Sequence, residues 1–258
     1  LLAGEYLLKG LRLKRQVRSA GIPVHSGIHD LHAGGSHRLE TVCYTHHEQS
    51  QKLESETLLL HEGVVSHIQL TRQLGCEHIW NELQRYWHPL LDEWGNTSVE
   101  GVAVAGDGGI VAGAMIAEAS GHLAALEAAF QLGTIRQKQR DSMAKVFHKE
   151  IRHHQAIRPF LEHLYPPSSE CLVPSNKATL VCRCEEVSAG KIQESLTWGA
   201  LDMSQIKAFT RCGMGLCQGR MCALTVAEII AHAQGKSPCE VGFFRGRPPN
   251  KPITLGQL

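Results

Sequence analysis

The sequence has almost no net charge, few aromatic residues and no long apolar run. Lys and Arg number 26 against 25 Asp and Glu, which leaves a formal net charge of +1. Such a balance gives no electrostatic reason to bind nucleic acid or an acidic membrane surface. The longest weakly polar stretch, residues 101–119, contains Asp107, Glu118 and many glycines, so it is not a membrane span. We therefore expect no nucleic-acid partner and no transmembrane segment.

A complete G-x-G-x-x-G motif, the phosphate loop of dinucleotide-binding folds, is also absent. The chain begins without Met and without a signal peptide, so we expect a fragment lacking its N-terminal part or the product of a truncated gene. Nine cysteines, an odd number, favour a reducing compartment over a disulfide framework. We predict a cytoplasmic, globular protein that reaches a membrane only through a complex.

Four of the cysteines form two close pairs in the C-terminal third. Cys182 and Cys184 form a C-x-C pair, and Cys212 and Cys217 form a C-x4-C pair in a Gly-rich segment. Two short thiol pairs can converge on one inorganic centre, and an all-thiolate set suits an iron–sulfur cluster or structural zinc. The tight C-x-C spacing favours iron–sulfur, with zinc and two disulfides as the alternatives. Cys222 is expected to be a small buried hydrophobe inside a helix.

The residues between and after these pairs have helical patterns. Ser188 is predicted to cap a first helix, and Asp202 with Gln205 a second. A third helix is predicted from Gln218, which would place Cys217 before a helix N-terminus, where the thiolate is favoured. The residues expected on the buried faces are Ile192, Leu196, Ile206, Phe209, Met221, Leu224, Ile229 and Ile230.

A second motif lies in residues 97–113. An apolar strand is predicted to end in Gly106-Asp107, and an Ala-rich helix should follow Gly113 and run to about Leu132. A strand, a Gly-rich turn and a helix N-terminus together make an anion site, because glycine permits close backbone approach. Asp107 can accept hydrogen bonds from a polyol. A tight β–α turn without a ligand would have the same pattern, so the motif alone leaves both interpretations open.

The remaining segments have simpler patterns. Residues 4–20 predict a basic amphipathic helix, residues 134–165 predict polar helices, and the tail after residue 233 is expected to be extended. Short strands are predicted at residues 22–25, 28–33, 39–44 and 56–60, with a turn at 46–52 and a buried strand at 58–65.

The cysteine motifs resemble a known family. V-C-R-C-E-E-V and T-R-C-G-M-G-L-C-Q-G-R-M-C are similar to the [2Fe-2S] domain related to bacterioferritin-associated ferredoxin. The second motif resembles the cluster domain at the C-terminus of the FAD-containing subunit of opine oxidases, hydrogen cyanide synthase and dye-linked proline dehydrogenase. The resemblance implies that the cluster ligands are Cys182, Cys184, Cys212 and Cys217.

The same resemblance extends to the second motif and to the tail. T-S-V-E-G-V-A-V-A-G-D resembles the second FAD-binding motif of two-dinucleotide-binding flavoproteins, which implies that Asp107 bonds the ribityl chain. The turn facing the flavin would comprise Gly106, Gly108, Gly109 and Gly113. Residues 58–65 resemble the strand that returns to the FAD domain, but Ser66-His67 stand where that family has Pro-Asn. The tail resembles the R-P-P-x-K-P-I-T-L-G-E-L ending of these subunits and is expected to dock.

The resemblance implies an α/β, partial two-dinucleotide-binding flavoprotein fold, incomplete at the N-terminus, plus a small all-α [2Fe-2S] domain. The implied parts are an inserted NAD-binding-like domain (residues 1–65), an FAD-binding domain with a helical extension (66–165), a linker (166–178), the cluster domain (179–235) and a tail (236–258). The implied function is electron transfer between FAD and [2Fe-2S] in a heteromeric oxidoreductase acting on CH–NH donors. A second FAD-containing subunit would oxidise the substrate, so no catalytic acid or base is assigned. The alternatives are an NAD(P)H-dependent flavoprotein reductase and a non-enzymatic iron–sulfur or zinc docking module.

Overall fold

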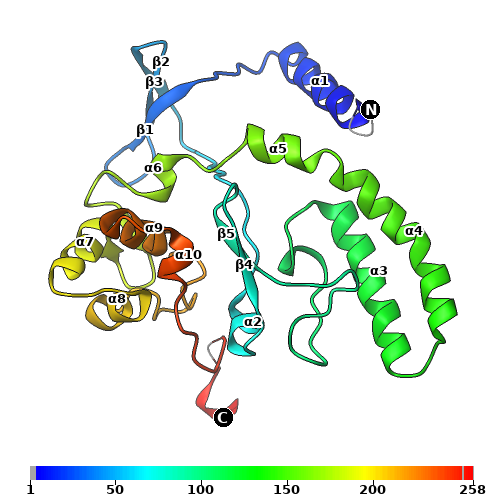
Figure 1. Cartoon of the computed structure of the whole chain (residues 1–258). Coiled ribbons are helices and arrows are strands. Elements are labelled where there is room, and N and C mark those ends of the chain that lie inside the picture. Colours follow the sequence, from blue (N-terminus) through cyan, green and yellow to red (C-terminus); the bar gives the residue numbers. More distant parts are fainter. Residues whose placement is uncertain (1–3, 252, 258) are drawn as a thin grey trace. The chain divides into compact units, whose positions relative to one another are not determined.

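The computed structural model describes residues 4–251 and 253–257 and divides the chain into two compact units, one up to Glu62 and one from Gly63 onward (Figure 1). Both units contain helices and short antiparallel strands. Within the described ranges, no helix combines the length and apolar character needed to cross a membrane. The predicted division into five parts stays a prediction.

The first unit is a helix followed by a three-stranded sheet. Helix α1 (Gly4–Ser19) confirms the expected amphipathic helix and buries none of its residues. Strands β1 (Ile28–Gly34), β2 (Thr41–His46) and β3 (Gln49–Glu54) form an antiparallel sheet in that order.

Two of the strand predictions for this unit are wrong. No strand forms at residues 22–25 or 56–60, and β3 lies in the segment expected to be a turn. His47 and Glu48 both adopt positive φ, 49° and 62°. A two-residue turn with this geometry folds the chain directly back on β2, so backbone pairing rather than hydrophobicity makes the third strand.

The second unit begins with an exposed segment and a small hairpin. Residues 58–65 were expected to be a buried strand, but Leu59 is 90% exposed and no strand in the described part of the chain pairs with this segment. A strand needs such pairing to satisfy its backbone groups. Helix α2 (Gln69–Gln73) follows, and then β4 (His78–Asn81) and β5 (Tyr86–Pro89) pair antiparallel, with Trp80 opposite Trp87.

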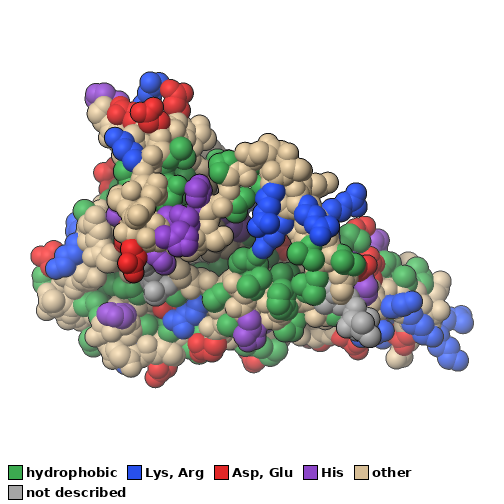
Figure 2. All heavy atoms as spheres, turned by 90° about the horizontal axis from the view of Figure 1, so that it is seen from above, with side chains coloured by type: hydrophobic (Ala, Val, Ile, Leu, Met, Phe, Trp, Pro, Cys, Tyr) green, Lys and Arg blue, Asp and Glu red, His purple; other side chains and the backbone are tan. Residues whose placement is uncertain are grey.

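A long helical hairpin comes next. Helices α3 (Ala114–Gln131) and α4 (Gln137–Gln155) lie side by side (Figure 1), followed by α5 (Arg158–Leu164) and α6 (Ser169–Leu172). The helices predicted here are confirmed. Between α3 and α4, Arg140 Nη1 donates to Glu127 Oε2 at 2.5 Å, and both side chains are nearly buried. In the space-filling view of the whole molecule from above, hydrophobic side chains reach the surface beside Lys and Arg (Figure 2).

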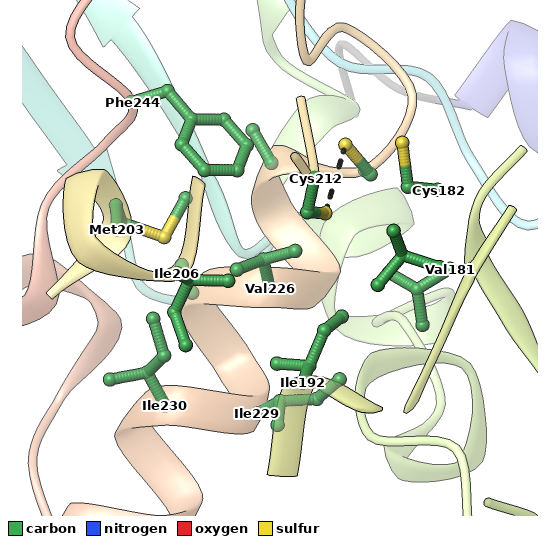
Figure 3. Packing of buried hydrophobic residues seen from close by; sticks show 14 of the residues in the cluster. Val181, Cys182, Ile192, Met203, Ile206, Cys212, Val226, Ile229, Ile230 and Phe244 are labelled. Atoms are coloured by element: carbon green, nitrogen blue, oxygen red, sulfur yellow. Dashed lines mark hydrogen bonds between the residues drawn. The ribbon is translucent and has the colours of Figure 1, made fainter. Parts of the chain in front are cut away.

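The cysteine-rich segment forms its own core. Its two short strands, β6 (Leu180–Cys182) and β7 (Val187–Ser188), pair as a ribbon. Four helices follow: α7 (Ala189–Thr197), α8 (Met203–Thr210), α9 (Ala223–Gln234) and α10 (Pro238–Val241). The 3-10 helix η2 (Leu255–Gln257) lies in the tail. Ile192, Ile206, Ile229 and Ile230 are fully buried, as predicted (Figure 3). Burial of such aliphatic side chains supplies about 1.5–3 kcal/mol each.

The two helix N-caps predicted from the sequence, Ser188 and Asp202, are confirmed. Ser188 accepts from the backbone N–H of Lys191, and Asp202 accepts from that of Gln205 at 2.8 Å. The Gln205 side chain accepts from the N–H of Leu201 instead of Asp202, so the second arm is shifted by one residue.

The segment is not all-α, because its first cysteine pair begins on the β6–β7 ribbon. The third helix starts at Ala223 rather than Gln218, because residues 217–222 form tight turns. Phe209 and Met221, expected inside, are 50% and 67% exposed.

Candidate metal centre and dinucleotide turn

Three cysteine sulfurs meet in the core of the cysteine-rich segment. Cys182 ends β6, Cys212 follows α8 and Cys222 is the N-cap residue of α9. All three are buried, and their sulfur atoms lie within 4.8 Å of one another. The Cys212 and Cys222 sulfurs are 3.9 Å apart (Figure 3). These residues form a buried all-sulfur cluster of side chains with no carboxylate or imidazole in it.

The other two predicted ligands, Cys184 and Cys217, form a second, more exposed pair. Cys184 is exposed and Cys217 is half-buried, and each side chain shifts the pKa of the other. Burial opposes ionisation of Cys217, but hydrogen bonds from the backbone N–H groups of Met221, Gly219 and Arg220 lower the pKa of this thiol. A backbone hydrogen bond from Cys217 favours the Cys184 thiolate, yet the side-chain bond to Cys217 raises the pKa of Cys184.

The two groups interact electrostatically. The charge of Cys182 contributes to raising the pKa of Cys184, and the charge of Cys217 contributes to raising that of Cys222. For Cys222 the hydrogen bond with Cys212 is the largest cause and burial the next, so its thiol stays protonated while no metal is bound. A thiophilic metal would displace that proton, because the thiolate is the ligating form.

Of the four predicted ligands, Cys182 and Cys212 come together with Cys222, while Cys184 and Cys217 form the separate, more exposed pair. The four-ligand assignment stays a prediction. The interpretation of Cys222 as a buried hydrophobe inside a helix is wrong in its location, because the late start of α9 makes Cys222 the N-cap and leaves its sulfur beside Cys212. A signal was present in the sequence: Cys217 and Cys222 repeat the C-x4-C spacing of Cys212 and Cys217. All nine cysteines are free thiols in the structure.

Glycines bring the cysteine loop, residues 212–222, close to its neighbours. A Cβ on Gly215 would lie 2.1 Å from the Cys184 Cβ, so only glycine lets the two cysteine-bearing segments approach. Gly213 and Gly219 both have positive φ and pack against the buried Phe244 ring of the tail. The expected docking of the tail is confirmed at Phe244.

The dinucleotide turn is only partly as expected. A single bridge, Asn96 to Ala103, replaces the predicted strand, because the described residues offer no neighbouring strand to complete a ladder. Residues Gly106–Gly108 form the 3-10 helix η1, and the Gly106 N–H donates to Ser120 Oγ of α3 at 2.9 Å. Asp107 is exposed.

Gly113 gives the turn its open end. It is the N-cap residue of α3 with φ of 106°, and a Cβ there would meet nothing within 4 Å. No side chain caps α3, so its first backbone N–H groups are available to an anion such as a phosphate oxygen. Gly108 and Gly109 instead pack closely, against Val104 and Leu91 side chains. The turn fits the close backbone approach of an FAD ribityl chain at its Gly113 end.

A hydrogen-bonded bridge joins the dinucleotide turn to the cysteine loop. Ser66 Oγ donates to the Gly109 carbonyl at 2.9 Å in a buried position, and the adjacent His67 accepts at Nε2 from Arg220 Nε. Arg220 Nη1 donates to the Cys217 carbonyl at 3.0 Å, and Nη2 donates to Asn250 of the tail. Ser66-His67, which stand where the resembling flavoproteins have Pro-Asn, thus connect the two candidate cofactor regions.

The fold and the C-terminal segment each match known proteins. The structure resembles L-proline dehydrogenase from P. horikoshii with a TM-score of 0.70 and 23% identity, covering 97% of this chain and 48% of that one, which shows a shared fold. Residues 176–258 match the family model described as the sarcosine oxidase A3 domain. That range includes all five cysteines of the candidate centre.

Three relatives have a higher sequence identity to this chain than the proline dehydrogenase has. The A subunit of opine oxidase from Rhizobium meliloti is 42% identical over 257 residues, covering 100% of this chain and 49% of the relative. Its counterpart from Agrobacterium tumefaciens strain Ach5 is 40% identical, covering 100% and 51%. Hydrogen cyanide synthase subunit HcnB of Pseudomonas aeruginosa is 28% identical, covering 97% and 55%. The chain is homologous to these subunits and spans about half of their length.

Proposed function

We propose that this chain is the cluster-bearing portion of an electron-transferring subunit in a heteromeric oxidoreductase that oxidises CH–NH bonds of opine, amine or imino-acid substrates. The observation that carries the proposal is the group of three buried cysteine sulfurs within 4.8 Å of one another, in a segment homologous to the opine oxidase A subunit that also contains Cys184 and Cys217. A [2Fe-2S] cluster would supply a one-electron carrier at this position. Homology alone supports this class of substrate, and no residue of this chain is assigned to its chemistry.

The protein's own residues set up the centre. Cys182, Cys184, Cys212 and Cys217 remain the proposed ligands, with Cys222 as a fifth thiol that competes for a place in the set. Backbone N–H groups of residues 219–221 point to the Cys217 sulfur, and such hydrogen bonds stabilise thiolate and raise the potential of a bound cluster. The exposed Cys184 places one edge of the centre at the surface, where a partner can exchange electrons.

The dinucleotide turn is the proposed flavin contact. Asp107 and the N-terminus of α3 after Gly113 would hold the ribityl and phosphate part of FAD, and Gly106, Gly108 and Gly109 would shape the turn. The proposed partner is a second FAD-containing subunit that carries out substrate oxidation. The Ser66–His67–Arg220 bridge supports electron transfer between the two cofactor regions, because it fixes the cysteine loop relative to the turn.

The test is a series of five single Cys→Ser variants, at 182, 184, 212, 217 and 222, reconstituted anaerobically with iron and sulfide. The unaltered chain should be red-brown and contain two irons and two sulfides, the stoichiometry of a [2Fe-2S] centre. Four variants should lose the colour and the reduced-state EPR signal, and the fifth should keep both.

The variant that keeps its cluster identifies the cysteine that is not a ligand. We expect this variant to be Cys222→Ser. Cys43→Ser and Cys239→Ser are matched controls outside the centre. A colourless preparation with one zinc per chain would overturn the proposal in favour of a zinc docking module. Retention of the cluster in all five variants would show that these cysteines are not its ligands.

A further inference from the structure

Arg72 of α2 presents a fixed guanidinium with two unpaired donors. Its Cζ lies over the Trp87 and Phe243 rings, 4.7 and 5.1 Å from their centroids, which holds the planar group between two aromatic side chains. Nε and Nη2 are buried and have no hydrogen-bond partner among the described residues. Buried donors without an acceptor are costly, so this edge of Arg72 requires one.

Arg85 shows what the same edge does elsewhere in the protein. There, Nε and Nη2 donate to the two carboxylate oxygens of Glu228, at 2.8 and 2.6 Å. These two nitrogens form the side-on fork with which arginine binds planar or tetrahedral oxyanions through two parallel hydrogen bonds. The same two nitrogens of Arg72 have no carboxylate partner among the described residues, and Arg72 lines a cavity.

The surroundings of this fork are strongly cationic. The cavity is lined by Arg72, Lys207 and Arg245, and an adjoining groove by Lys207, Arg245 and Arg247. No Asp or Glu lines either one, and within residues 4–251 and 253–257 no carboxylate pairs with these four side chains. Several positive charges held together without a counter-charge repel one another, and a bound anion relieves that repulsion.

The dimensions fit a ligand that reaches inward with its charged end. The enclosed part has a volume of about 20 Å³, room for a ligand oxygen but not for a whole ligand. The groove that continues from it has about 360 Å³, within the range of small-molecule sites. Gln69 lines the same cavity, and its Oε1 is also buried and unpartnered, so this oxygen can accept from a phosphate hydroxyl or a water.

We propose that the cavity and groove bind a phosphate group, with its oxygens on the Arg72 fork and its remaining charge neutralised by Lys207 and Arg245. A doubly charged phosphate matches this number of cations better than a carboxylate does. The groove is also lined by Met214 and Gln218 of the cysteine loop, so the ligand would lie beside the candidate metal centre. The phosphate would come either from the free ion or from a phosphorylated small molecule whose body occupies the groove.

Calorimetric titration of the 258-residue chain with sodium phosphate, AMP and sodium acetate tests this proposal. Arg72→Lys keeps the charge and removes the fork, and should weaken phosphate binding about tenfold. Lys207→Gln should weaken it about threefold to tenfold. Arg211→Lys and Lys191→Gln make the same chemical changes outside the groove and should leave the affinity unchanged.

The outcomes separate the alternatives. Tighter binding of AMP than of phosphate assigns the site to a phosphorylated small molecule, and equal affinity assigns it to the free ion. Acetate bound as tightly as phosphate overturns the phosphate assignment. No binding of phosphate or AMP, or equal affinity in all four variants, overturns the site itself. If Arg72→Lys fails to fold, the affinity of Lys207→Gln for phosphate tests the site instead, because Lys207 is only half-buried and is not part of the hydrophobic core.

Discussion

The ion pair between Arg85 and Glu228 should be a principal support of the cysteine-rich segment, and replacing Arg85 by Met tests that role. Arg85 lies in the turn between β4 and β5, and Glu228 lies on α9. The Glu228 side chain is only 6% exposed, against 26% for Arg85. Without Arg85 the carboxylate would remain buried and unpaired.

The magnitude follows from that burial. Removing one partner of a fully buried ion pair costs about 3–5 kcal/mol. Because Arg85 is a quarter exposed, water can reach the abandoned carboxylate in part, and we expect Arg85→Met to lower the free energy of unfolding by about 2–3 kcal/mol. The double variant with Glu228→Leu should recover most of that loss, since no charge is then buried.

Urea denaturation, followed by tryptophan fluorescence and circular dichroism, measures these differences. Arg211→Met is the matched control, because Arg85 and Arg211 both have positive φ, 55° and 65°. Like Arg85, Arg211 donates through Nε to a glutamate, here Glu185, at 2.8 Å. Its side chain is 69% exposed, so the control should lose less than about 1 kcal/mol. If Arg85→Met costs no more than Arg211→Met, the burial argument is wrong.

Two further predictions concern His78 and Gly215. Burial, and next the charge of Arg72, lower the pKa of His78 from 6.5 to about 4, so the unfolded state binds more protons between these values and stability should fall as the pH drops from 6.5 to 4. The shift corresponds to about 3.4 kcal/mol, which we reduce to about 1–2 kcal/mol because the side chain is only partly buried and solvent screens its charge, and His78→Gln should flatten this part of the pH–stability curve. Gly215→Ala should abolish cluster assembly, because its Cβ would collide with that of Cys184, whereas Gly133→Ala, at a helix end with free space, should not, as iron content and visible absorbance will show. A Gly215→Ala protein with full iron content would contradict the close approach.

Features set by a few neighbouring residues could be predicted from the sequence. Ser188 and Asp202 cap α7 and α8 because a cap depends on one side chain and a backbone N–H three residues on. The long helices α3 and α4 likewise follow from local composition, which is Ala-rich in α3 and polar in α4. Features that depend on distant partners could not be predicted. Residues 58–65 have the composition of a buried strand, but no neighbouring strand in the described residues pairs with them.

The candidate sites show the same difference between local features and features that depend on distant residues. The cysteine spacing alone indicated a metal centre, but the place of Cys222 depended on where α9 begins, and the tight turns of residues 217–222 delay that start. Ser66-His67 could be recognised only as a departure from the family pattern. Their role depends on Gly109 and Arg220, which are 43 and 153 residues away along the chain from Ser66 and His67 respectively. Arg72 likewise has ordinary sequence neighbours. Its unpaired fork becomes evident only when β5 and the tail bring Trp87 and Phe243 to either side of it.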